Sequence, residues 1–266
     1  MRYGLVEVLL LGIASGLVGV FVVQRQLTFF AHALAHTIFP AVVLASVWRI
    51  DLTIGALVGA ALTLLLVSRL QRLRDVGQSS AVGVVLVVLF SLGVVLVGVF
   101  RVPSADVGAS LIGDVLGASP ADVALSAVLV GALALALGLL FWPIVLSAFD
   151  PGSARALGLP VALLHFIILA MVAATAIVSV RVVGVILTVA VLVVPAATAL
   201  RWTRRVRPAM LLAGSVGAGS GVVGLYTAYY VPIAPAAVVV LFLSTSFVLS
   251  TLLTMRKSAR ADRPVG

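Results

Sequence analysis

Residues 28–40 read TFFAHALAHTIFP and interrupt a chain that is otherwise almost entirely hydrocarbon. His32 and His36 are four residues apart, so on a helix they share one face, with Cβ atoms roughly 5–6 Å apart. From there both imidazoles can reach one metal ion at roughly 2.0–2.1 Å. Pro40 has no N–H to donate to the His36 carbonyl, which predicts a bend. The stretch therefore predicts a bent helix that carries two candidate metal ligands.

The composition places this helix in a membrane. Of the 266 residues, 63% are hydrophobic and 9% are charged, whereas a soluble domain has about 45–50% apolar and about 25% charged residues. At about 20 residues per span, the apolar content allows roughly eight to ten helices. Polar groups inside a bilayer are expensive and mark functional sites. We therefore interpret His32 and His36 as the place where a divalent cation crosses.

The sequence argues against nucleotide binding by a P-loop and against nucleic acid binding. The sequence has no P-loop of the form G-x-x-x-x-G-K-[ST], so it does not bind a nucleotide in that way. The net charge of +9 lies in the predicted loops and needs no nucleic acid partner. The absence of cysteine excludes disulfides and thiolate ligands.

Hydropathy predicts an all-α fold: a polytopic helix bundle forming one transmembrane domain over residues 1–255. Nine spans are expected, near 4–23, 32–48, 52–67, 81–100, 122–142, 161–179, 182–200, 209–227 and 235–254. The pairs Gly12/Gly16, Gly55/Gly59 and Gly217/Gly221 have the spacing that lets helix backbones approach closely in a membrane. Residues 256–266 are a basic tail, for which contact with anionic lipid is the simplest explanation.

The placement of lysine and arginine predicts the orientation. With the C-terminus in the cytoplasm, the outer segments hold only Arg2, Arg49, Arg101 and Arg181, and every other lysine and arginine lies inside. Cytoplasmic loops carry an excess of these residues. We therefore expect the N-terminus outside and the C-terminus in the cytoplasm.

The predicted cytoplasmic loop 143–160 is longer than a simple turn requires. Asp150 has the character of a helix N-cap, with Pro151 at the first helical position. Gly158 and Pro160 then stop the helix after about two turns. A short helix is expected in this loop.

Five separate stretches, in this order, resemble the metal-ion permeases of ABC importers (ABC-3 type), which take up zinc, manganese or iron. The matching stretches are AHALAH (31–36), LIGDVLG (111–117), FDPGSARALGLP (149–160), VGVILTVAVLVVPAAT (183–198) and GLYTAYY (224–230). Each is short, but together they extend over essentially the whole chain. The resemblance implies that the chain is a permease subunit in the cell membrane.

The resemblance also implies a set of partners. It implies a homodimer served by two cytoplasmic ATPase subunits and by an extracytoplasmic solute-binding protein that delivers the ion. The segment 147–160 would be the coupling helix that fits a groove on the ATPase, through Phe149, Asp150, Arg155, Ala156, Leu157 and Gly158. Hydrolysis would belong to the partner, so this chain is not expected to be an enzyme. No permanent cofactor is expected, only a transported divalent metal.

The sequence departs from the family at one ligand position. Where the family usually has an aspartate four residues before the histidine, this chain has His32. Imidazole pairs suit zinc, copper, nickel and iron, whereas carboxylates suit manganese and magnesium. This difference favours zinc as the cargo, with manganese and iron as alternatives.

Five residues have weaker functional interpretations. Asp114 lies in a matched stretch and is a candidate for docking or gating, with a helix cap as the alternative. Pro195 is expected to kink the seventh span, which suits gating as well as ordinary packing, and the bend at Pro40 is a candidate for gating or docking. His165, alone in the first turn of the sixth span, is expected to be structural. Glu7 is expected to reach water at the membrane interface.

Three rival classes are less well supported. A secondary transporter or channel would need intramembrane carboxylates for ion coupling, and the spans offer almost none. A metalloprotease would need the H-E-x-x-H motif, but Ala33 occupies the glutamate position. A permease for haem, cobalamin or siderophores is the nearest rival, although those chains are generally longer.

Overall fold

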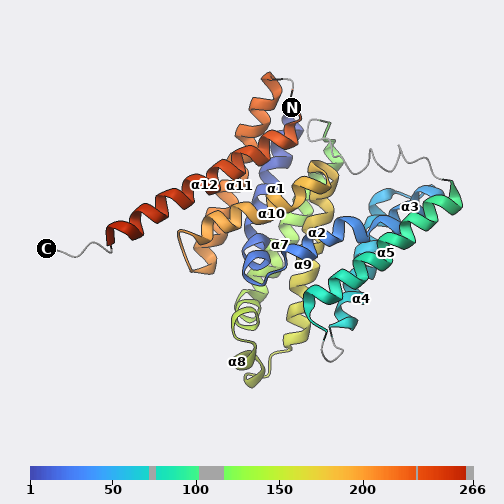
Figure 1. Ribbon diagram of the computed structural model, residues 1–266, viewed down its shortest axis with the longest axis horizontal. Helices are drawn as coiled ribbons and strands as arrows, with labels where there is room; N and C mark the ends of the chain where they lie inside the picture. Colours follow the sequence, from blue (N-terminus) through green and yellow to red (C-terminus); the bar gives the residue numbers. More distant parts are fainter. Residues whose placement is uncertain (72–75, 102–116, 232, 262–266) are drawn as a thin grey trace. The chain divides into compact units, whose positions relative to one another are not determined.

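The computed structural model describes residues 1–71, 76–101, 117–231 and 233–261, and the regular structure in these ranges is entirely helical (Figure 1). The helices are α1 (Arg2–Gln24), α2 (Thr28–Thr37), α3 (Phe39–Val47), α4 (Leu52–Leu70), α5 (Gln78–Phe100), α7 (Pro120–Phe149), α8 (Pro151–Ala156), α9 (Val161–Val183), α10 (Val185–Leu200), α11 (Val206–Tyr230) and α12 (Pro235–Ala261).

The predicted spans correspond to these helices. Among the described residues, eight segments are long and apolar enough to cross a membrane, and α2 and α3 together form one of them, Thr28–Val47. The span predicted at 182–200 forms α10, whose 16 residues fall short of the roughly 20 that a full crossing needs. The all-α membrane bundle is confirmed, with one span shorter than expected.

The boundary before the predicted cytoplasmic loop is corrected. The fifth span was expected to end at 142, but α7 continues through Pro143 to Phe149. Proline removes a single backbone donor, and transmembrane helices tolerate this loss. The sequence after Pro143 remains apolar up to Phe149, so the helix continues until Asp150 begins the next one.

Contacts divide the chain into two compact units, which are described separately. Unit 1 consists of Met1–Val23, Val115–Ala134 and Ala190–Gly266, and unit 2 consists of Gln24–Asp114 and Leu135–Val189.

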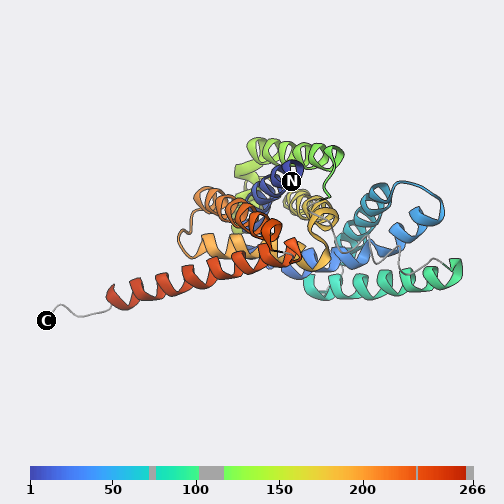
Figure 2. The same ribbon diagram turned by 90° about the horizontal axis from the view of Figure 1, so that it is seen from above.

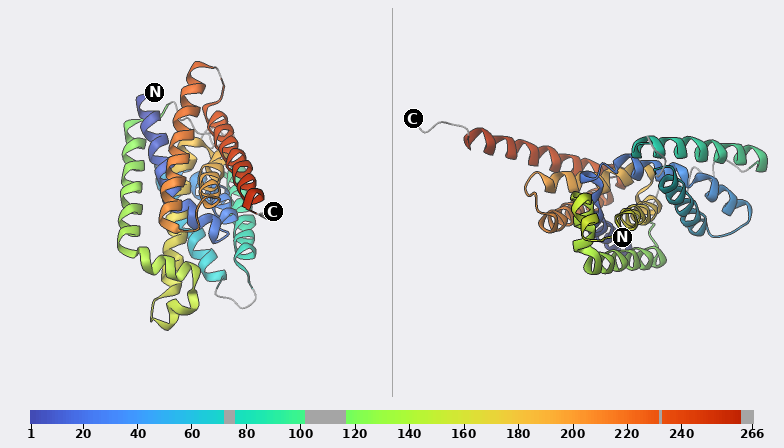
Figure 3. Two further views of the ribbon diagram at one scale, coloured as in Figure 1. Left: turned by 90° about the vertical axis from the view of Figure 1, so that its left-hand side faces the viewer. Right: turned by 90° about the horizontal axis from the view of Figure 1, so that it is seen from below.

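In unit 1, small residues bring helix backbones into direct contact. A Cβ added to Gly12 would lie 2.6 Å from the Cα of Ala218, and one added to Gly16 would lie 2.5 Å from the Cα of Gly214. No side chain fits at either position, which confirms that the small-residue pairs allow close approach. We call this α1–α11 contact the small-residue seam. The consecutive helices α11 and α12 also pack against each other (Figure 3).

Glu7 contradicts its sequence interpretation. It was expected to reach water, but its side chain is fully buried in unit 1 and accepts a hydrogen bond from the Ser126 hydroxyl of α7. A carboxyl group can be buried where a polar partner satisfies it. Hydropathy alone does not show that Ser126 would lie opposite Glu7.

In unit 2, α3, α4 and α5 lie side by side (Figures 1 and 2). Gly59 of α4 faces the chain break between α2 and α3, and a Cβ there would lie 2.9 Å from the Cα of Ile38. The break falls at Ile38, with Pro40 in the first turn of α3. The interruption predicted from Pro40 is therefore present, just before the proline.

Candidate functional site

The histidine pair lies on α2, immediately before the break at Ile38. The ring centres of His32 and His36 are 5.2 Å apart, with their planes at 74°. Two imidazoles bound to one tetrahedral ion at about 2.0–2.1 Å have ring centres roughly 5 Å apart. His32 is exposed and His36 is half-buried. The rings thus share a face at a spacing that suits a common ion.

Two phenylalanine side chains lie beside His36. The ring of Phe90 on α5 meets the His36 ring edge-on, with ring centres 5.9 Å apart. The ring centres of Phe39 and Phe90 are 5.7 Å apart. Within the described part of the chain, no hydrogen bond engages the ring nitrogens of His32 or His36. Histidines of resident metal sites are usually oriented by such bonds. Rings without them suit an ion that binds briefly and leaves.

The pair supplies only part of a coordination shell. No group of three or more histidine, cysteine, aspartate or glutamate side chains able to hold a metal occurs among the residues that the structure describes. Zinc sites in proteins are usually four-coordinate. His32 and His36 alone can therefore supply half of such a shell, with the exposed side of His32 open to further ligands.

The predicted coupling segment forms a short capped helix, α8. The Asp150 carboxylate accepts the Ser153 backbone N–H at 3.0 Å, as expected for an N-cap. Hydrogen bonds from the Ser153 side chain, and then from its backbone N–H, hold the pKa of the Asp150 carboxyl below its usual value. Gly158 has φ +74°, a left-handed conformation that ends the helix with little strain. The expected start signal at Asp150 and the expected stop signal at Gly158 therefore mark the two ends of α8.

The segment presents apolar and polar groups to its surroundings. Leu157 is 69% exposed and Phe149 is 47% exposed, and the other predicted contact residues are exposed as well: Asp150, Arg155, Ala156 and Gly158. Within α8 itself only Ala154 is buried, and α8 packs against α9. A large exposed leucine at a helix end fits a surface that another protein covers.

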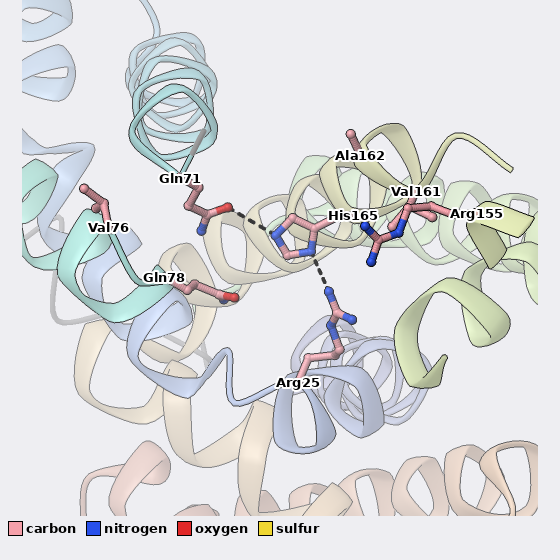
Figure 4. A pocket seen from close by; sticks show the side chains of 8 residues that line it. All are labelled: Arg25, Gln71, Val76, Gln78, Arg155, Val161, Ala162 and His165. Carbon is pink, nitrogen blue, oxygen red and sulfur yellow. Dashed lines mark hydrogen bonds between the residues drawn. The ribbon is translucent and has the colours of Figure 1, made fainter. Parts of the chain in front are cut away.

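Sequence reasoning missed a polar junction beside α8. The Arg25 guanidinium donates to the carbonyl oxygens of Ala148 at 2.9 Å and Ser147 at 3.3 Å, and Arg25 Nη2 lies 2.9 Å from His165 Nδ1 (Figure 4). His165 Nε2 in turn lies 3.3 Å from Gln71 Oε1. We call these contacts the Arg25 junction. Arg25 had been interpreted only as a topology residue.

The junction fixes the state of His165. Because arginine can only donate hydrogen bonds, His165 Nδ1 must accept, and the proton lies on Nε2, which donates to Gln71. Both ring nitrogens are used, so the structural role expected for His165 fits and a metal-ligand role does not. Burial lowers the pKa of the Arg25 guanidinium, although arginine remains charged.

Three other residues were predicted to dock or gate. Asp114 lies outside the described residues. Pro195 is buried inside α10, in unit 1, whereas His32 and His36 belong to unit 2. Pro40, buried in the first turn of α3, is the only one of the three that lies close to the pair in the chain.

Comparison with known proteins decides the family. Residues 1–254 match the family described as the ABC 3 transport family. The chain belongs to this family. The manganese transport system membrane protein MntC of Halalkalibacterium halodurans is 31% identical over 251 residues, covering 94% of this chain and 86% of that protein. The manganese import system permease protein ScaB of Streptococcus parasanguinis is 30% identical over 250 residues, with 94% and 89% covered.

A solved structure agrees. PsaBC from Streptococcus pneumoniae, determined in complex with a Fab, matches with a TM-score of 0.82 at 27% identity, covering 94% of this chain and 90% of that chain. This ABC-3 chain is therefore a multi-pass permease subunit of the plasma membrane. Family membership removes the secondary-transporter and metalloprotease alternatives.

Proposed function

We propose that this chain is the permease of an ATP-driven importer of divalent metal ions, with manganese as the first candidate cargo. The observation that carries the proposal is the His32/His36 pair, which holds two imidazoles at a shared-ion spacing in a membrane-spanning segment. The relatives named for manganese transport support the class of cargo.

The ion would pass between two copies of the chain. Each copy would offer His32 and His36, and two pairs facing each other would complete a four-ligand shell that one pair leaves half-filled. Such a site must bind weakly, because conduction requires that the ion also leave. The exposed His32 ring and the absence of orienting hydrogen bonds from described residues suit transient binding.

The driving force would come from separate ATPase subunits. The exposed side chains of Phe149 and Leu157 would fill a groove on the ATPase, with Asp150, Arg155, Ala156 and Gly158 at the contact. A solute-binding protein would deliver the ion from outside, and Asp114 remains the candidate docking residue. Pro40 and Pro195 remain candidates for gating.

The orientation can be tested directly because the chain has no cysteine. With the N-terminus outside, a Leu157→Cys variant should react with a membrane-impermeant maleimide only from the cytoplasmic side. A Tyr230→Cys variant should react only from the outside, because both side chains are exposed and the nine-span topology, in which α10 crosses despite its length, places them on opposite faces. Labelling of the two sites from the reverse sides would invert the topology.

Manganese and zinc are supported by different observations. The relatives' names favour manganese over the zinc that the sequence alone suggested. The two imidazoles without a carboxylate favour zinc, which therefore remains the second candidate. The substitution of His32 for the usual aspartate weakens the match to manganese without removing it.

The decisive experiment reconstitutes the permease with its ATPase and binding protein in liposomes. ATP-dependent uptake of manganese and of zinc is measured separately and then in competition. The proposal predicts uptake of a divalent metal that stops without ATP, with manganese preferred. Uptake that proceeds without ATPase subunits, or no uptake of any divalent ion, would contradict it.

A further inference from the structure

The Arg25 guanidinium bonds to the two helices that flank α8, the proposed coupling helix. α8 leaves the end of α7 and leads into the start of α9. Arg25 bonds to the Ser147 and Ala148 carbonyls in the last turn of α7, and to His165 near the start of α9. One side chain is thus tied to the chain on each side of α8.

The contact of Arg25 with α7 caps the C-terminal end of that helix. The last carbonyl groups of a helix have no partner within the helix, and a cationic side chain there also interacts favourably with the helix dipole. Arg25 supplies this cap from a distant part of the sequence. The Arg25 side chain is half-buried, so the bonds form where water competes less.

In the chain, Arg25 is followed almost directly by α2, the helix that carries His32 and His36. Only Gln26 and Leu27 separate it from α2. Leu27 is fully buried, and Gln26 has φ +55°, a left-handed conformation that is unusual outside glycine. A turn this short, fixed at Leu27, cannot absorb a displacement of Arg25 without moving α2, a ten-residue helix that carries His32 in its middle and His36 in its last turn.

The surroundings leave room for the junction to rearrange. Arg25, Gln71, Gln78, Arg155 and His165 line an open pocket of about 530 Å³ in unit 2 (Figure 4). The pocket is open to its surroundings, so its lining side chains are not packed on every side. Hydrogen bonds join Arg25 to His165 and His165 to Gln71 across it, and such bonds can exchange as α8 moves.

We propose that Arg25 is a positioning residue that transmits the movement of α8 to the helix carrying His32 and His36, with His165 as its second anchor. This inference rests on the proposed function, since it takes α8 as the coupling helix and the histidine pair as the ion's route. It assigns no chemistry to Arg25, only the mechanical link between the two sites.

The test measures how many metal ions are carried for each ATP hydrolysed. The permease is reconstituted with its ATPase and binding protein, and manganese uptake and ATP hydrolysis are recorded for wild type, Arg25→Gln and a charge-matched control, Arg69→Gln, at an exposed arginine in the last turn of α4. Loss of a charge-assisted hydrogen bond shifts an equilibrium by about tenfold or more. Arg25→Gln should therefore lower uptake per ATP about tenfold, while hydrolysis and membrane abundance stay close to wild type.

A pair of His165 variants separates the link from simple structural support. Asparagine places its carbonyl oxygen where His165 Nδ1 accepts from Arg25, whereas glutamine places a polar group near the Nε2 position that faces Gln71. His165→Asn should therefore keep most of the coupling, and His165→Gln should lose it. A purely structural role would move abundance, hydrolysis and uptake together in both variants.

The outcomes are distinguishable from a failure of the proposed function. If wild type carries no divalent ion, the proposed function fails. If wild type transports but Arg25→Gln leaves uptake per ATP unchanged, or lowers uptake and hydrolysis in proportion, only the role of Arg25 is overturned. Equal uptake per ATP in His165→Asn and His165→Gln would overturn the role of His165 as the second anchor.

Discussion

The small-residue seam of unit 1 and the Arg25 junction of unit 2 hold helices together by opposite means. In the seam, Gly12 and Gly16 let two backbones touch, with no space for a single added carbon. In the junction, polar side chains that line an open pocket meet through hydrogen bonds. The seam is rigid because nothing fits between its helices. The junction holds its helices while leaving them able to move.

The largest effect is expected from filling the seam. Gly16→Val places a branched side chain where even a Cβ would overlap the α11 backbone, so the folded protein should be largely lost from the membrane. Gly219→Val is the matched control, since Gly219 lies on α11 with open space around it. Detergent-soluble monodisperse protein, followed by fluorescence size-exclusion, measures the result. Equal yields of the two variants would mean that the seam is not closely packed.

A smaller loss is expected from breaking the junction. Arg25→Gln removes charge-assisted hydrogen bonds and should lower the free energy of unfolding by about 1.5–3 kcal/mol. The protein should remain folded, because the apolar packing of unit 2 is unchanged. Thermal unfolding in detergent, compared with Arg69→Gln, measures the difference. A loss of folded protein as complete as in Gly16→Val would make the junction part of the rigid frame instead.

The seam could be predicted from the sequence far more completely than the junction. The Gly12/Gly16 and Gly217/Gly221 spacings are local patterns, and the hydrophobic runs defined nearly every helix. The junction joins residues up to 140 positions apart, and no periodicity links Arg25 to His165. Asp150, Pro151 and Gly158 marked α8 because capping signals are also local, whereas the pairing of Glu7 with Ser126 required the packing of two helices.

The histidine pair falls between these cases. The spacing of His32 and His36 predicted their shared face, but the contact of His36 with Phe90 required tertiary structure. The choice of metal was not fixed by spacing, because the ligand type and the relatives favour different ions. The bend was placed correctly by Pro40, since the loss of a backbone donor is a local effect.

The ligand difference itself predicts a change in selectivity. His32→Asp restores the carboxylate that the family usually has, and carboxylates suit manganese better than imidazole does. We expect the ratio of manganese to zinc uptake to rise by about tenfold, equivalent to about 1.4 kcal/mol. Competitive uptake of the two ions measures the ratio, with membrane abundance as the control. An unchanged ratio would show that His32 does not contact the ion.

The smallest effect is expected at the cap of α8. The hydrogen bonds from Ser153 hold the pKa of Asp150 below its usual value, so this carboxylate stabilises α8 at neutral pH. The contribution is lost as the pH falls through the lowered pKa. Asp150→Ala should weaken ATPase binding slightly and remove this acid dependence, as measured by co-purification of the ATPase across pH. An identical acid dependence in the variant would assign it to another group.

The most direct test of the central claim is ATP-driven manganese uptake by the reconstituted complex carrying His32→Asn and His36→Asn together. Asparagine keeps a polar side chain of similar size but is a poor replacement for an imidazole ligand. If the pair lines the route of the ion, uptake falls to background while abundance and ATPase binding match wild type. Uptake at the wild-type rate in this double variant would contradict the account.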